Sequence, residues 1–180
     1  MVLFCSQTFG QPVVAPEDKV KAAFLYNFAK LVDWPTNVLA QPREPLVIGV
    51  LGRDPFGSVL EDTVHRKEVN GHEIQIKRYD QVAQATNCQV LFISESEYHK
   101  TDSIFNELQG KPVLTVADAK AYDDKVMILL FKSEDRIQFK INLPATRESG
   151  LRLSSRLLRL DRSLHPGHAQ PEDSENKTAP

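Results

Sequence analysis

The sequence predicts a mixed α/β domain with three layers, in which helices flank a mostly parallel sheet and a C-terminal antiparallel hairpin lies at one edge. Three observations lead to this fold class. Short, continuously apolar runs recur along the chain, as in strands that are buried on both faces. Amphipathic segments of helical period separate these runs, which is the alternation expected of a parallel sheet. Near the end, two strand-like runs only a few residues apart predict the hairpin.

The composition is that of an ordinary globular protein. Its 180 residues are 41% hydrophobic and 26% charged, with a formal net charge of -2. This length favours a single domain. The slightly acidic balance argues against a nucleic-acid-binding protein and against a polybasic membrane-surface module. No apolar run approaches the ~18 residues that span a bilayer, so we expect no direct membrane insertion.

We expect three regions along the chain. Residues 1–16 are interpreted as the remnant of a truncated secretory signal with a lead-in, because they are mildly apolar but lack a charged start. A frayed N-terminus is the alternative. Residues 17–164 form the α/β domain. Residues 165–180 contain no large aliphatic side chain and therefore predict a disordered tail.

The first helix is predicted from Pro16 to Trp34, and Pro35 ends it because the residue before a proline disfavours helical dihedral angles. One broad face of this helix gathers the mainly apolar side chains Val20, Ala23, Phe24, Asn27, Phe28, Leu31 and Trp34. Asn27 is therefore expected either to be a buried amide with hydrogen-bond partners or to contact a ligand.

The remaining elements follow from periodicity and turn residues. Strands are predicted at Leu46–Leu51, Glu73–Arg78, Gln89–Ile93 and Val113–Val116, and the hairpin at Val126–Phe131 and Arg136–Ile141. Helices are predicted from Pro55, with Asp54 as its cap, to about Thr63, and at Tyr98–Gln109, Asn142–Ser149 and Ser154–Leu160. Short helical turns are expected at Gln81–Ala85 and Asp118–Tyr122.

No residue pattern indicates catalysis, so we predict no enzyme, no cofactor and no metal site. The stretch from Gly49 to Gly57 follows a strand as a phosphate loop does, but it lacks both the dinucleotide fingerprint and the P-loop lysine. The histidines lack the paired spacing of a zinc site. Ser94 occupies the position where a phosphoreceiver carries its aspartate, and no nucleophile-elbow motif surrounds it. We interpret Cys88 as a small buried hydrophobe rather than as a reactive thiol.

Three stretches together carry a family resemblance. The first reads KAAFLYNFAK over residues 21–30 and ends in Asp33-Trp34-Pro35. The second is IGVLG over residues 48–52, followed by DPFG over residues 54–57. The third pairs FKINL, residues 139–143, with GLRLSSRLL, residues 150–158. In this order they resemble the YfiR/HmsC family of small periplasmic proteins, over about Glu17 to Leu160.

The resemblance implies an exported, periplasmic and typically dimeric regulator. Its founding members repress a membrane-bound diguanylate cyclase through that enzyme's periplasmic sensor domain, which affects cyclic di-GMP signalling and biofilm formation. Other members act beside sensor kinases. The best-known members carry paired cysteines, whereas the expected mature part of this chain has only Cys88, which argues against redox control by disulfides.

Two hypotheses about binding sites follow. A repressor is expected to contact its partner through the last hairpin and closing helices, where apolar and arginine side chains mix as they do in interface anchors. These candidates are Phe131, Lys140, Arg147, Leu151, Arg156 and Leu158. Core packing is the alternative for any one of these leucines.

The second hypothesis is a periplasmic small-molecule sensor acting with a histidine kinase. Its ligand would lie in a cleft near strand ends, lined by Asn27, Trp34, Arg53, Phe56 and Asn142. The structural alternative is that Trp34-Pro35 fixes the first helix to the sheet and that Asn142 caps a helix.

Overall fold

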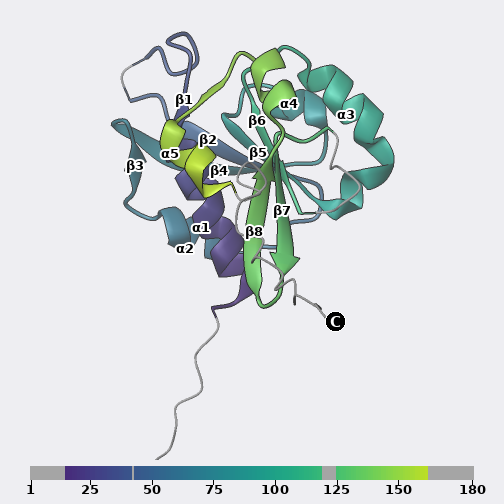
Figure 1. Ribbon diagram of the computed structural model, residues 1–180. Helices are drawn as coiled ribbons and strands as arrows, with labels where there is room; N and C mark the ends of the chain where they lie inside the picture. Colours follow the sequence, from purple (N-terminus) through teal and green to yellow (C-terminus); the bar gives the residue numbers. More distant parts are fainter. Residues whose placement is uncertain (1–14, 42, 119–124, 162–180) are drawn as a thin grey trace, which may run out of the picture.

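A seven-stranded sheet forms the centre of the computed structural model, which describes residues 15–41, 43–118 and 125–161 (Figure 1). The strand order is β3-β4-β2-β5-β6-β7-β8. The strands are β2 (Leu46–Leu51), β3 (Glu68–Val69), β4 (His72–Tyr79), β5 (Val90–Ile93), β6 (Leu114–Ala117), β7 (Ile128–Ser133) and β8 (Arg136–Ile141). Pairing is parallel from β4 through β2, β5 and β6 to β7. The predicted mixed α/β fold with a mostly parallel sheet is confirmed.

Both edges of the sheet are antiparallel. The strands β7 and β8 pair from Ile128↔Ile141 to Ser133↔Arg136 and are joined by two residues. The short strand β3 pairs antiparallel with β4 at the other edge, and periodicity did not predict it. Two residues are too few to show an alternation of apolar and polar side chains. Only the pairing with β4 identifies this segment as a strand.

The central strands β2, β5 and β6 are buried along their whole length, as their continuous apolar runs predicted. Alternate side chains of each strand enter different cores. In β2, Ile48 and Val50 join one hydrophobic cluster, whereas Val47 and Leu51 join the other. By contrast β4 alternates between half-buried and exposed residues, and Ile74 and Ile76 lie on the same, half-buried side.

Helices of the two cores come from different parts of the chain. The first core includes residues of α1 (Glu17–Lys30), α2 (Val59–Val64), α4 (Leu143–Glu148) and α5 (Ser155–Leu160). The second includes residues of the 3-10 helix η1 (Val82–Ala85) and of α3 (Thr101–Leu108), which the 3-10 helix η2 (Glu95–Lys100) precedes. Figure 1 shows α5 lying across α1 and close to β8.

The buried stripe of α1 differs from the predicted one. The fully buried residues are Ala22, Leu25, Phe28 and Ala29, and Asn27 is exposed. Small alanines allow α1 to approach the sheet closely. Phe28 belongs to both the predicted and the observed stripe, whereas Phe24 is half-buried, and the rings of Phe24 and Phe28 lie 5.5 Å and 5.1 Å from that of Phe139 on β8.

The first helix ends at Lys30, four residues earlier than predicted, because the chain then forms a second, two-stranded sheet. The strand β1 (Val32–Asp33) pairs antiparallel with β9 (Arg152–Leu153). The backbone N–H of Ser154 also donates to the carbonyl of Leu31 at 2.9 Å. This ladder ties the closing segment of the domain to the end of α1.

The prediction that Asp54 and Pro55 start the second helix is wrong. The helix α2 begins at Val59, while Asp54 Oδ1 accepts a hydrogen bond from the backbone of Phe56 at 2.7 Å and so closes a local turn. The predicted helix at Tyr98–Gln109 is split between η2 and α3. The predicted turn at Asp118–Tyr122 lies mostly outside the described residues, as do the predicted signal remnant up to residue 14 and the tail at 165–180.

Among the helices that the structure describes, none combines the length and the apolarity needed to cross a bilayer.

Candidate functional site

A small groove separates α1 from α5 and the end of β8. It encloses about 190 Å³. The lining residues are Phe24, Asn27, Phe28, Lys30, Leu31, Phe139, Arg156, Leu157 and Leu160. The groove therefore combines Asn27, from the predicted ligand set, with Arg156, from the predicted partner set. We call it the α1–α5 groove.

The helix α5 is held in place at both ends. At its start, the side chain of Ser154 accepts a hydrogen bond from the backbone of Leu157 at 3.2 Å, as an N-cap does. At its end, Asp161 is fully buried, and its Oδ2 accepts from the backbone N–H of Ile141 on β8 at 2.9 Å. Leu157 inserts into the core between these two anchors. The outer side of α5 is thereby fixed against α1.

The α1–α5 groove has an aromatic floor and polar groups at its rim. The rings of Phe24, Phe28 and Phe139 pack against one another, with the first two 5.6 Å apart. The side chains of Asn27 and Arg156 make no hydrogen bond or ion pair with the described residues. Next to them, Leu160 is 56% exposed. Such a mixture of aromatic, aliphatic and arginine side chains is typical of the centre of a protein–protein interface.

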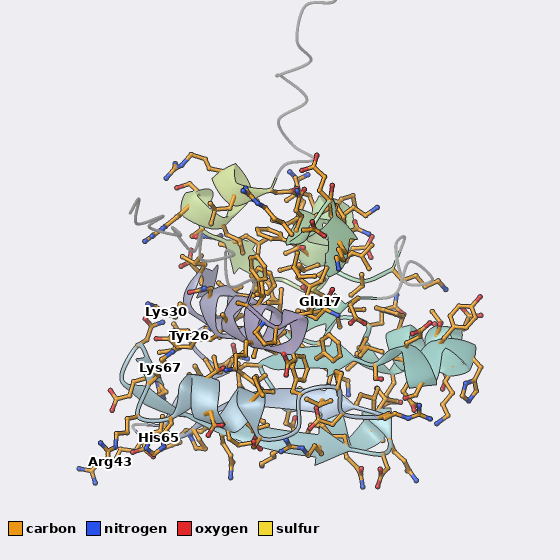
Figure 2. All side chains as sticks on the ribbon, turned by 90° about the horizontal axis from the view of Figure 1, so that it is seen from below. Glu17, Tyr26, Lys30, Arg43, His65 and Lys67 are labelled. Carbon is orange, nitrogen blue, oxygen red and sulfur yellow. The ribbon has the colours of Figure 1, made fainter. Side chains whose placement is uncertain are left out.

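The lysine at the rim of the groove is oriented by a neighbouring ring. The Lys30 ammonium lies 5.3 Å from the ring centre of Tyr26, and the Lys67 ammonium lies 4.6 Å from the same ring (Figure 2). Cation–π contacts of this kind are worth about 0.5–1 kcal/mol at exposed sites. They extend the positive rim of the groove toward α2.

The other predicted partner residues lie around the hairpin and the closing helices, but not in the groove. Phe131 and Lys140 are half-buried on β7 and β8, and Arg147 is exposed on α4. Leu158 is half-buried and packs against the first core. Leu151 is only 4% exposed and belongs to that core, so it offers no contact surface. Sequence reasoning missed Leu160, since a leucine beside a core leucine carries no signal of exposure.

The five predicted ligand residues do not line a common cavity. Asn27 lies in the α1–α5 groove, and Phe56 is buried with its ring 4.9 Å from that of Phe92. The Trp34 indole donates to the carbonyl of Ala29 at 3.1 Å, which fixes the end of α1. Asn142 caps α4, accepting from the backbone of Ala145 at 3.2 Å. Arg53 lies in a separate crevice at the carboxyl ends of the strands.

Cys88 is buried and its thiol donates to the carbonyl of Ala85 at 3.0 Å. Burial raises the pKa of this thiol to about 12, which keeps it protonated and unreactive at neutral pH. Within the described ranges, no three His, Cys, Asp or Glu side chains are placed to hold a metal ion.

The fold is that of a mixed α/β domain, and the α1–α5 groove brings aromatic, aliphatic and basic side chains together at its surface. Residues 18–162 match the model of the YfiR/HmsC-like family, and the chain belongs to this family. The family is periplasmic, regulatory and non-catalytic, and it acts with membrane-bound signalling partners. No curated protein matches the chain.

Proposed function

We propose that this protein binds the periplasmic sensor domain of an inner-membrane diguanylate cyclase and holds that enzyme inactive. Membership of the YfiR/HmsC-like family supports the class of partner. The α1–α5 groove carries the proposal about where the partner binds, because an aromatic floor, Arg156 and the exposed Leu160 lie together there.

Repression would follow from differential affinity. A protein that binds the inactive state of the enzyme more tightly than the active state shifts the population toward the inactive one. Release of the repressor would raise cyclic di-GMP in the cell and so favour biofilm formation. We also propose that the protein is exported to the periplasm and that it works as a homodimer.

The primary experiment is crosslinking of the tagged protein in the cell envelope, with the captured proteins read by mass spectrometry. The test variant is Arg156→Glu, and Arg159→Glu is its matched control, since both arginines are exposed on α5 but only Arg156 lines the groove. We expect Arg156→Glu to abolish capture of a membrane cyclase and to raise intracellular cyclic di-GMP, whereas Arg159→Glu changes neither.

The other outcomes of the crosslinking test the interface position and the second candidate function. Unchanged capture by a folded Arg156→Glu protein would place the interface elsewhere. Capture of a histidine kinase instead of a cyclase would favour the second function, a sensor module acting with that kinase. Self-crosslinks alone would remove the repressor model. The homodimer is tested separately by sedimentation velocity of the purified protein, where a monomer at micromolar concentration would refute it.

A further inference from the structure

The sheet has one point at which its loops diverge. The strand β4, which follows β2 in the chain, lies on one side of β2, and the next strand, β5, lies on the other side of β2. The parallel strands therefore have the order β4-β2-β5-β6-β7. The loops that follow β2 and β5 therefore lead in opposite directions and leave a crevice at the carboxyl ends of these strands. Open α/β sheets commonly bind small ligands at this position.

A cavity of about 350 Å³ occupies this point, a volume in the range of small-molecule pockets. We call it the switch-point crevice. Its lining comes from the ends of three neighbouring strands: Arg53 and Pro55 after β2, Phe92, Ser94, Glu95 and Ser96 at β5, and Asp118 after β6.

The loop that carries Arg53 is held firmly by the end of β4. Arg78 donates through Nε to Asp54 Oδ2 at 2.8 Å and through its NH2 group to the carbonyl of Gly57 at 2.8 Å. It also pairs with Glu61 on α2. The backbone N–H of Arg53 in turn donates to Ser96 Oγ at 2.9 Å, which joins the two walls of the crevice. This wall of the crevice is therefore preorganised, which lowers the entropic cost of binding a ligand.

The lining of the crevice carries side chains of both charges. Asp118 pairs with Lys21 of α1 at 2.6 Å, and these side chains are only 20% and 18% exposed. Arg53 and Glu95 form no ion pair or side-chain hydrogen bond with any residue that the structure describes. The lining therefore carries one cationic and two anionic side chains, and the pairing of Asp118 with Lys21 leaves Arg53 and Glu95 as one available charge of each sign.

A phosphate group fits this crevice poorly. In phosphate-binding loops, a glycine leaves the backbone open to the ligand. Here the backbone at Gly52 is already covered, since a Cβ at this position would lie 2.5 Å from Ser96 Oγ and 2.8 Å from Glu97 Oε1. Glu97 is buried and pairs with Lys100 at 2.8 Å, so a carboxylate stands where a phosphate would approach.

We propose that the switch-point crevice binds a small zwitterion, a molecule that carries a carboxylate and an ammonium group, such as an α-amino acid. The guanidinium of Arg53 would receive the carboxylate, in the geometry that arginine favours. Glu95 would receive the ammonium group, while Phe92 and Pro55 supply apolar contact. This site is distinct from the α1–α5 groove and does not depend on the proposed partner.

The test is calorimetric titration of the purified full-length protein with L-α-amino acids, using inorganic phosphate as an anion-only probe and putrescine as a cation-only probe. We expect at least one amino acid to bind and neither control probe to do so. Arg53→Gln and Glu95→Gln should each weaken that binding by about tenfold to a hundredfold, the usual value of a hydrogen bond to a charged group. The matched control Arg43→Gln, at another exposed arginine outside the crevice, should leave it unchanged.

Three results would overturn the proposal: no binding by any amino acid, equal binding by the folded Arg53→Gln protein, or preferential binding of phosphate. The melting temperature of each unliganded variant verifies folding. Because these titrations contain no partner protein, their failure would not affect the proposed repressor function, and failure of the envelope crosslinking would not affect them.

Discussion

The α1–α5 groove and the switch-point crevice differ in how the chain builds them. The groove is apolar at its floor, and its outer helix is held by a short ladder, a serine cap and one buried aspartate. The crevice is polar, and a network centred on Arg78 fixes its loop. One region suits another protein's surface, whereas the other suits a small polar molecule. Changes in the two regions should therefore produce separable effects.

The largest expected effect concerns the crevice. Gly52 has φ of +85°, and a Cβ there would approach Glu97 Cγ to 2.6 Å, so Gly52→Ala combines backbone strain with a steric clash. We expect a loss of about 2–4 kcal/mol in the free energy of unfolding, measured by urea denaturation. Gly57→Ala is the control, since Gly57 has φ of +54° but open space around it, and it should cost only about 1 kcal/mol. Equal losses would show that Glu97 and Ser96 do not pack on this turn.

The next effect concerns the groove. Replacing Asp161 with alanine removes the acceptor of the buried Ile141 N–H, and a buried donor without a partner costs about 1–3 kcal/mol. Asp161→Ala should lower the free energy of unfolding by this amount, whereas Asp161→Asn, which keeps an acceptor, should lose less. Hydrogen exchange at Ile141 is the second measurement. Unchanged protection of that amide in the alanine variant would contradict the proposed anchor of α5.

A smaller effect is expected at the loop network of the crevice. The Arg78 side chain is 41% exposed, so solvent screening limits its ion pairs, and Arg78→Ala should cost about 1 kcal/mol at neutral pH. Arg78→Lys keeps the charge but loses the fork of donors, so it should recover only part of this loss. A lysine variant as stable as the native protein would show that charge alone holds the loop.

The same network predicts a pH dependence. The hydrogen bond from Arg78 lowers the pKa of Glu61 below its usual value of about 4.3. The contribution of the Arg78–Glu61 pair to stability is therefore complete above the usual pKa of Glu61. It is lost as the pH falls through the lowered pKa that Glu61 has in the folded state. The stability difference between the native protein and Arg78→Ala should shrink as the pH falls below about 4. A difference that stays constant through this range would exclude Glu61 as the partner that matters.

Sequence patterns identified the sheet strands of four or more residues because each consists of a continuous or alternating apolar run. They also identified the cap at Asn142, since asparagine precedes helices for a local hydrogen-bonding reason, and they placed the start of the last helix at Ser154, which caps it. They failed at β1, β3 and β9, where two-residue strands exist only because a distant segment pairs with them.

The candidate sites were less accessible to sequence reasoning. Arg53 lines the switch-point crevice and Arg156 lines the α1–α5 groove, but the other members of each predicted set lie outside the cavity that its arginine lines, except that Asn27 of the ligand set lies with Arg156. Glu95, Asp118 and Lys21 carried no signal, because charged residues near turns are usually solvated. Their grouping depends on which strands are neighbours in the sheet.

By itself, the sequence determined the α/β class, the burial of the central strands and the family, since these depend on local apolar runs and on motifs read in order. The tertiary structure decided which face of α1 is buried, where Arg78 finds its partners and which side chains meet in each cavity. These features depend on contacts between residues far apart in the chain, such as Lys21 with Asp118, and no local period encodes such a contact.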